Sequence, residues 1–308
     1  MTPDDFTNQE LMLEVGDGHT LYVHDWGAAD AKVPILFLHG GPGGGCNDGH
    51  KGWFDPTRQR VIFHDQRGSG KSTPYGSLEH NTTQDLVGDI DKIADKFNLD
   101  KFILTGSSWG SGLALAYGLA QPQLVTAMVL GGIFTGSQAE IDWIDQGRFV
   151  EHFPDAWDAY LATVPAKHRT NPTAYHVQRM FGDDAAAARQ SAYDYGNLSS
   201  ATYKLDDRLQ PQSLADDFDP VPKMLEAHYM ANGCFMPDNY ILDHAGELTM
   251  PIWLVQGRYD FICPPRTAYE LDKRLPNSEL IWTISGHKYE REDWQIRRQL
   301  LLRLTADR

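Results

Sequence analysis

The chain has 308 residues, of which 41% are hydrophobic, and a formal net charge of -15 at pH 7. A chain of this length buries a large core, either as one domain or as one domain that carries an insertion. The negative charge argues against a nucleic-acid partner and against binding to an anionic membrane surface.

Targeting signals and cysteine usage favour a cytoplasmic protein. The acidic N-terminal stretch MTPDDFTNQELMLEV lacks the apolar region of a secretory signal, and no apolar run reaches the length of a membrane span. The three cysteines are odd in number and scattered, which fits a reducing compartment better than a disulfide framework.

Strands alternate with helices in the first part of the chain. Residues 10–26 predict a β-hairpin around a Gly-Asp-Gly turn. Short apolar runs predict buried strands at residues 33–40, 60–65, 101–106 and 125–132. A helix is expected over 83–97, with Thr82 and Asp85 as its capping box, and another after residue 108. This alternation predicts a mostly parallel sheet covered by helices on both faces.

The pattern changes between residues 136 and 245. This segment has no clear buried-strand run, and its aromatic residues recur at helical spacing. The strand and helix alternation then resumes, with strands at 251–257 and 278–284 and helices at 264–275 and 290–305. We therefore predict an α/β core made of residues 1–135 and 246–308, and an inserted helical cap over 136–245.

The stretch ILTGSSWGSG (103–112) contains three serines, of which one has the spacing of a nucleophile elbow. The elbow pattern is G-x-S-x-G, because the serine lies on a strained turn between a strand and a helix. Ser108 has Gly106 and Gly110 at the required positions, whereas Ser107 and Ser111 do not. Ser108 also lies where a predicted strand meets a predicted helix, so we take it as the candidate nucleophile.

An acid and a base follow Ser108 in the order that this class of hydrolase requires. Asp260 comes directly after the predicted strand WLVQG, and His287 lies in the loop after the next strand. His287 is the only one of the 12 histidines that follows Asp260. A serine hydroxyl is a weak nucleophile unless an imidazole takes its proton, and a carboxylate orients that imidazole. Taken alone, an aspartate in a turn is more often a turn former; the order of all the features favours a catalytic triad.

The tetrahedral oxyanion of acyl transfer requires backbone N–H donors. We assign one to Trp109, the residue after the nucleophile, and the other to Gly41 in the glycine-rich loop LHGGPGGG.

A second motif, DQRGSGKS (65–72), imitates a phosphate-binding loop but is incomplete. The full pattern needs glycine five residues before Gly70, and Asp65 stands there instead. A structural role is expected, in which Asp65 and Arg67 anchor the loop beneath the site. The sequence has no metal-binding signature, and we expect no metal or organic cofactor.

The stretch MLEAHYMANGCF (224–235) closes the predicted cap and contains Glu226. Two interpretations stay open on the residues alone. Glu226 is either part of a solvated helix face or a carboxylate above the active site that binds a substrate cation.

Several motifs together resemble the proline iminopeptidase family of α/β hydrolases. They are HGGPGGG, DQRGSGKS, GSSWGSGLALAYG, EIDWIDQG, AHYMANGCF, VQGRYDFICP and SGH. The resemblance implies an α/β-hydrolase fold and release of an N-terminal residue, typically proline, from small peptides or aminoacyl substrates. It implies the triad Ser108, Asp260 and His287, oxyanion donors at Gly41 and Trp109, and a role for Glu226 in binding the substrate's free α-amine.

The cap departs from the family pattern at one point. The family usually carries a second amine-binding glutamate in a motif such as W-S-V-W-E-G, and this chain has AYDYGN at 192–197, with Gly or Asn at the glutamate position. Tyr193 and Tyr195 of this stretch are candidate substrate-binding residues. Asp194 is the nearest acid, but each step of one residue along a helix turns the side chain by about 100°, so its side chain points in a different direction from the family's glutamate. Recognition of the amine should therefore be weaker.

The leading hypothesis is a cytoplasmic serine aminopeptidase that acts on small peptides through an acyl-enzyme. One alternative is an esterase, amidase or acyltransferase for an aminoacyl or specialised-metabolite substrate. Another is a non-catalytic binding protein on the same fold. The sequence leaves the acyl specificity, the choice between hydrolysis and acyl transfer, the pathway and the oligomeric state open.

Overall fold

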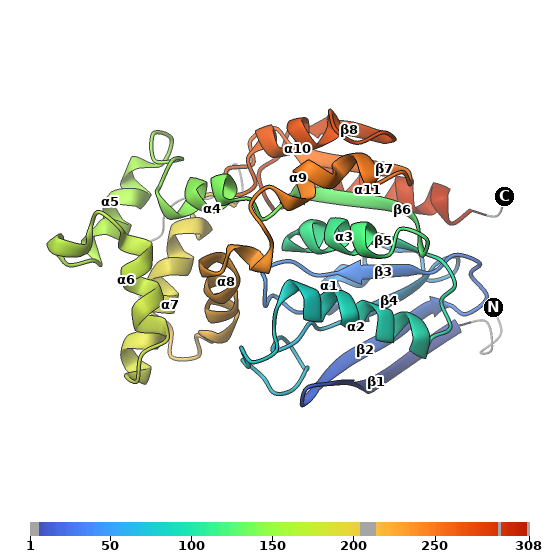
Figure 1. Ribbon diagram of the computed structural model, residues 1–308, viewed down its shortest axis with the longest axis horizontal. Helices are drawn as coiled ribbons and strands as arrows, with labels where there is room; N and C mark the ends of the chain where they lie inside the picture. Colours follow the sequence, from blue (N-terminus) through green and yellow to red (C-terminus); the bar gives the residue numbers. More distant parts are fainter. Residues whose placement is uncertain (1–5, 204–213, 289–290, 307–308) are drawn as a thin grey trace.

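A computed structural model describes residues 6–203, 214–288 and 291–306. One eight-stranded sheet forms its centre, with strand order β1-β2-β4-β3-β5-β6-β7-β8 (Figure 1). The strands are β1 (Phe6–Gly16), β2 (His19–Ala28), β3 (Ile35–Leu38), β4 (Arg60–His64), β5 (Phe102–Ser108), β6 (Val125–Ile133), β7 (Ile252–Gly257) and β8 (Ser278–Thr283). β2 pairs antiparallel with β1 and β4, and every pairing from β4 to β8 is parallel. The mostly parallel sheet expected from the sequence is thus confirmed.

Helices connect the parallel strands and fill the segment between β6 and β7. The core helices are α1 (Asp48–Lys51), α2 (Thr83–Lys96), α3 (Trp109–Ala120), α9 (Tyr240–His244), α10 (Pro265–Asp272) and α11 (Arg291–Leu304). The helices grouped at one end of the molecule are α4 (Gln138–Asp145), α5 (Pro154–Ala162), α6 (Pro172–Met180), α7 (Ala185–Ser200) and α8 (Val221–Ala231) (Figure 1). Short 3-10 turns lie at Ala166–His168, Gly233–Phe235 and Ala245–Glu247. No helix in the described ranges combines the length and the apolar character needed to cross a membrane.

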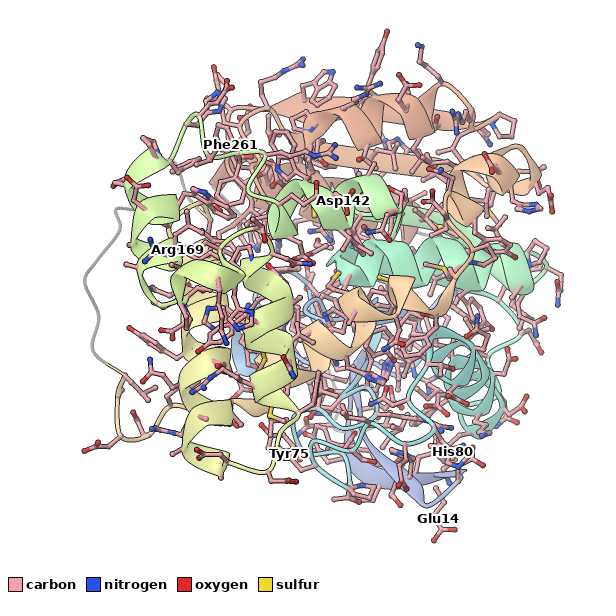
Figure 2. All side chains as sticks on the ribbon, turned by 60° about the vertical axis from the view of Figure 1, so that its left-hand side comes forward. Glu14, Tyr75, His80, Asp142, Arg169 and Phe261 are labelled. Carbon is pink, nitrogen blue, oxygen red and sulfur yellow. The ribbon has the colours of Figure 1, made fainter. Side chains whose placement is uncertain are left out.

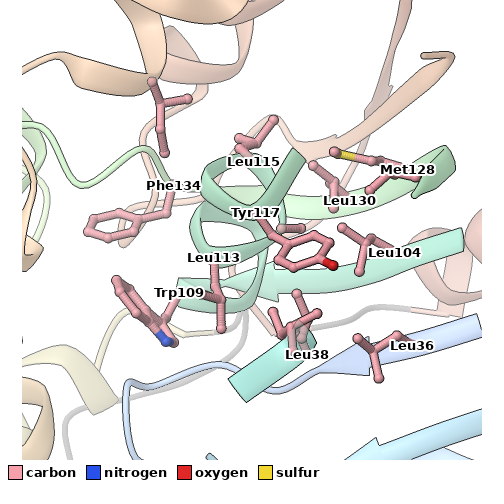
Figure 3. Packing of buried hydrophobic residues seen from close by; sticks show 14 of the residues in the cluster. Leu36, Leu38, Leu104, Trp109, Leu113, Leu115, Tyr117, Met128, Leu130 and Phe134 are labelled. Atoms are coloured by element: carbon pink, nitrogen blue, oxygen red, sulfur yellow. The ribbon is translucent and has the colours of Figure 1, made fainter. Parts of the chain in front are cut away.

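The two faces of the sheet bury two separate apolar clusters, because successive strand residues point to opposite faces. Leu36 and Leu38 of β3 join the cluster that packs against α2, α3 and α10, whereas Ile35 and Phe37 join the cluster beneath α11. Figure 3 shows the first cluster, in which α3 lies on the strand residues with its own apolar side chains. α3 is therefore held by burial on the strands that precede and follow it.

The far end of the predicted insertion packs with the core. Ile241 of α9 and Ala245 belong to the same apolar cluster as α3, and α9 contacts α3 directly. The helices α4 to α8 gather at one end of the molecule (Figure 1), and Ile141 of α4 and Tyr229 of α8 also join this apolar cluster.

The loop after β4 is anchored by charged groups, as the sequence indicated for Asp65 and Arg67. The Asp65 carboxylate accepts hydrogen bonds from the amides of Cys46 (2.6 Å) and Lys71 (2.7 Å). It therefore occupies the space beside Gly70 that an anion would need in a phosphate-binding loop. Arg67 forms a bidentate pair with Asp89 of α2, at 2.7 and 2.8 Å, and both side chains are 1% exposed.

The buried Arg67–Asp89 pair gives a stability prediction. The substitution Arg67→Met should lower the free energy of unfolding by about 3–5 kcal/mol, because it leaves the Asp89 carboxylate buried without its partner. Denaturant unfolding followed by circular dichroism measures the change. Arg58→Met, at an exposed position, serves as the control. A loss at Arg67 no larger than at Arg58 contradicts the assignment.

Candidate active site

Ser108 lies at the turn where β5 ends and α3 begins, and its backbone is strained. Its dihedral angles are φ 55° and ψ -130°, a region that residues with a Cβ rarely adopt. A Cβ on Gly110 would lie 2.2 Å from the Leu38 carbonyl oxygen, and one on Gly106 would lie 2.5 Å from the Gly110 carbonyl oxygen. Only glycine permits this approach of backbones, which explains the G-x-S-x-G spacing physically.

The two neighbouring serines are engaged in structural hydrogen bonds. The Ser107 hydroxyl accepts a hydrogen bond from Arg297 at 2.6 Å. The Ser111 hydroxyl donates to the Ser108 carbonyl at 2.7 Å and accepts from the Phe134 amide at 3.0 Å. Ser107 and Ser108 both line a cavity of about 280 Å³, but the Ser107 hydroxyl already has a partner.

Asp260 and His287 form a hydrogen-bonded pair. The Nδ1 atom of His287 lies 2.9 and 3.1 Å from the two carboxylate oxygens of Asp260. Asp260 is buried, and its Oδ1 also accepts the amides of Ile262 (2.9 Å) and Cys263 (2.8 Å). These bonds fix the carboxylate, which in turn fixes the imidazole with its Nε2 free to act on a proton.

His287 and Ser108 line the same cavity, which unites the three residues selected from the sequence. Among the described residues, no hydrogen bond joins the Ser108 hydroxyl to His287. The Cys263 thiol donates to the Ser108 hydroxyl instead, with Sγ 3.9 Å from Oγ. Catalytic hydrogen bonds are often long in unliganded enzymes and shorten once substrate is bound.

The loop with Gly41 lies against the elbow. Gly41 has φ +121°, and a Cβ on the preceding Gly40 would lie 3.1 Å from the Ser107 carbonyl oxygen. Trp109 begins α3, so its amide has no carbonyl one turn earlier in the helix to bond. Its indole Nε1 donates to Gln66 at 2.9 Å, which fixes the ring in the core. Gly41 lines the cavity beside Ser108, in the position expected of the loop that carries an oxyanion donor.

Glu226 reaches the cavity from α8, and it is paired with a lysine of the same helix. The Lys223 Nζ lies 2.7 Å from Glu226 Oε2, and the two side chains are 19% and 18% exposed. Burial lowers the pKa of Lys223, but the Glu226 charge and the contact with Tyr203 outweigh burial and raise it overall. Glu226 is therefore not a solvated helix face. The i, i+3 spacing from Lys223 was visible in the sequence as a signal of such a pair.

Tyr193 and Tyr195 are not among the residues that line the cavity at Ser108, and the substrate-binding role expected of them stays a prediction. The Tyr193 ring packs edge-on against Phe218, at 5.5 Å. Tyr195 is buried and lines a separate cavity of about 620 Å³ inside the cap. Asp194 accepts a hydrogen bond from Gln190 of its own helix, at 3.0 Å. From α7 and the residues just after it, Ser199 and Tyr203 line the Ser108 cavity instead, because a helix presents only one face to it.

Two further groups beside the triad have shifted pKa values. Burial, and then the Asp260 charge, raise the pKa of the Cys263 thiol well above its usual range, so the thiol stays protonated. Burial lowers the pKa of His50 to about 4, so this cavity-lining imidazole is neutral at pH 7. Within the described residues, one set of side chains lies close enough together to hold a metal ion: Asp260, Cys263 and His287, with ligand atoms within 4.8 Å of one another. A protonated thiol is a poor ligand, and the imidazole Nδ1 is already bonded to Asp260.

Asp145, at the end of α4, is a carboxylate near Glu226 that belongs to the motif EIDWIDQG but for which the sequence predicts no role. Its side chain lines the cap cavity and has no hydrogen-bond partner within the described residues. Burial, followed by repulsion from Glu226 and Asp142, raises its pKa to about 7. An isolated aspartate in a helical run has no signature of its own, since the effect depends on tertiary neighbours.

The Asp145 pKa predicts a pH-dependent stability. Because this carboxyl binds its proton more tightly in the folded chain, its contribution to stability is lost as pH rises from about 4 through 7. Asp145→Asn removes this loss, so it should stabilise the protein on the order of 1–2 kcal/mol more at pH 8 than at pH 5, after allowance for partial solvent screening. Denaturant unfolding at both pH values measures this, with Asp158→Asn, exposed in the same cap, as the control. Equal effects at the two pH values contradict the prediction.

Comparison with known proteins agrees with this geometry. Residues 33–287 match the family model of the alpha/beta hydrolase fold. Among solved structures, the alpha/beta hydrolase MGS-M2 from a deep-sea metagenome library is similar with a TM-score of 0.63, at 15% identity over 97% of this chain and 98% of that one. The proline iminopeptidase of Mycobacterium smegmatis has a TM-score of 0.59, at 19% identity over 96% and 97% of the two chains. At these identities, the structures show the fold.

Curated relatives show the family more narrowly. A probable proline iminopeptidase from Leptolyngbya boryana is 39% identical over 89% of this chain and 86% of its own length. A proline iminopeptidase from Arabidopsis thaliana is 39% identical over 87% of this chain and 72% of its own. This similarity extends through the cap as well as the core, and it agrees with the motifs around Ser108. The chain therefore belongs to the proline iminopeptidase family of α/β hydrolases.

Proposed function

We propose that this protein is a serine aminopeptidase that releases an N-terminal residue, typically proline, from small peptides through an acyl-enzyme. The observation that carries the proposal is that Ser108, on its strained turn, and His287, which is hydrogen-bonded to Asp260, line one cavity. Membership of a family of peptide-cleaving enzymes supports a peptide substrate.

Acylation begins when the Ser108 hydroxyl attacks the carbonyl carbon of the first peptide bond. His287 Nε2 takes the hydroxyl proton, and Asp260 stabilises the imidazolium through the bond to Nδ1. The carbonyl oxygen becomes an oxyanion that the amides of Gly41 and Trp109 stabilise. The loss of one such donor typically costs about 2.7–4 kcal/mol of barrier.

The tetrahedral intermediate then collapses. His287 returns the proton to the leaving nitrogen, so the C–N bond breaks and the shortened peptide departs. The acyl group stays on Ser108 until water, deprotonated by the same imidazole, attacks the ester carbonyl. The bond from the acyl carbon to Ser108 Oγ then breaks, His287 returns the proton to Oγ, and the free amino acid leaves. All proton transfers in both halves pass through one imidazole, which explains why its orientation by Asp260 matters.

The helices α4 to α8 serve as the cap that selects the acyl group. Their contribution to the Ser108 cavity is Ile144, Ser199, Glu226 and, just after α7, Tyr203. Trp143 Nε1 donates to the Phe261 carbonyl at 2.8 Å, which ties α4 to the loop that carries Asp260. In Figure 2, Asp142 of α4 and Phe261 lie at this same end of the cap. Glu226 is the carboxylate proposed to face the N-terminal side of the substrate.

Replacement of the nucleophile tests the proposal. Ser108→Ala should lower kcat for a chromogenic proline amide by roughly 10⁴-fold or more, because no other described hydroxyl in the cavity lies on the elbow. Ser278→Ala, in β8 away from the cavity, should retain activity. Thermal unfolding of both variants checks that they fold. Activity of Ser108→Ala within tenfold of the unsubstituted protein excludes the proposed mechanism.

A further inference from the structure

The carboxylate that faces the acyl side of the cavity already has a counter-ion within the chain. Glu226 lines the cavity with Ser108 and His287, and the Lys223 ammonium lies 2.7 Å from its Oε2. Both side chains are about four-fifths buried, at 19% and 18% exposure. A pair this short and this shielded is far less screened by salt than a surface ion pair.

The fold provides a specific space for the lysine. A Cβ on Gly196 of α7 would lie 2.9 Å from Lys223 Cε and 3.2 Å from its Cγ and Cδ. The aliphatic part of Lys223 thus packs against the bare backbone of α7, and any larger residue at 196 would displace it. Tyr203, whose ring stacks with the His287 ring at 5.8 Å, also raises the pKa of Lys223, after the larger effects of burial and Glu226.

A substrate ammonium that approached Glu226 would have to compete with this tethered one. If it displaced Lys223, the lysine charge would remain buried without its carboxylate, which is strongly unfavourable. If it did not, two ammonium groups would share one carboxylate. Among the described residues, the other acid near Glu226 is Asp145, which lines the cap cavity and is not among the residues that line the cavity at Ser108. A charged substrate amine therefore gains little binding energy from Glu226.

We propose that Lys223 is the resident counter-ion of Glu226, and that the site consequently also hydrolyses acyl substrates that have no charged nitrogen. The class is amides and esters of small carbocyclic or branched acids, of which cyclopentanecarboxylic acid is the carbon analogue of proline. The inference rests on the triad of the proposed function but not on its amine specificity. Hydrolysis follows the same steps, with the neutral acyl group on Ser108.

The experiment compares prolyl 2-naphthylamide with cyclopentanecarbonyl 2-naphthylamide, which have the same leaving group. In the unsubstituted protein, we expect turnover of both, with kcat/KM values within about tenfold. Lys223→Met frees Glu226 and should raise the prolyl preference by about tenfold or more, through a lower KM for the prolyl substrate. The double variant Lys223→Met/Glu226→Gln removes the pair as a neutral unit and should restore the original preference to within about threefold.

Lys51→Met is the matched control. Lys51 pairs with Asp48 at the same i, i+3 spacing and 2.8 Å, outside the cavity, so its loss should leave the preference unchanged. If Lys223→Met alone does not fold, the double variant provides the test. An unchanged ratio of kcat/KM for the prolyl and carbocyclic substrates supports the inference. A fall in kcat/KM of more than about tenfold for the prolyl substrate alone overturns it.

The outcomes separate the inference from the proposed function. Turnover of the prolyl substrate alone overturns the inference and supports the function, as does a prolyl preference in the unsubstituted protein well above tenfold. Turnover of the carbocyclic substrate alone supports the inference and overturns the function. Failure to hydrolyse either substrate overturns both.

Discussion

The contact between the backbone of Gly110 and the carbonyl of Leu38 is the constraint on which the site depends. It brings the first turn of α3 directly onto the end of β3, closer than any side chain at 110 would allow. Ser108 takes its positive φ because the chain must turn sharply from β5 into that helix. The same contact brings the glycine-rich loop after β3 beside the hydroxyl. The candidate nucleophile and the proposed oxyanion donors are thus positioned by one backbone contact rather than by several independent ones.

The core and the cap use charge in different ways. In the core, Asp260 is held by two amides and an imidazole, so its charge is directed at one proton-transfer partner. In the cap, Glu226 is compensated by Lys223, and the nearby Asp145 has a pKa near neutrality because burial and Glu226 oppose its ionisation. The carboxylate–imidazole pair of the core is therefore fixed by several hydrogen bonds, while the Glu226 charge in the cap is balanced locally by Lys223. This division follows the two layers of the fold.

Much of the core could be predicted because its signals are local. The Thr82–Asp85 capping box starts α2 where expected, and the G-x-S-x-G spacing places Ser108 at the end of β5. The order of Asp260 and His287 along the chain also sufficed to select them, since parallel strands bring their ends to one edge of the sheet. Ile241, close to the expected boundary at 245, packs with α3 through contacts distant in sequence, which no local signal indicates.

The cap contacts could not be predicted in the same way. Tyr193 was selected from its place in a motif, but a helix presents one face to the cavity, and that face belongs to Ser199 and its neighbours. The raised pKa of Asp145 arises from groups on other helices, and the room for Lys223 arises from Gly196 on a different helix. Such effects depend on how helices pack against each other, for which a single sequence has no periodic signal.

The hydrogen bond from Trp143 to the Phe261 carbonyl has a consequence for engineering chimaeras. Phe261 also packs edge-on against Phe153, at 5.0 Å, so the residue next to the triad acid is part of the cap's own apolar interior. Recombination at residues 136 and 245 would separate Phe261 from the aromatic residues of the cap that it packs against. A chimaera that places helices α4 to α8 on another hydrolase core should therefore also include the loop that carries Asp260 and Phe261.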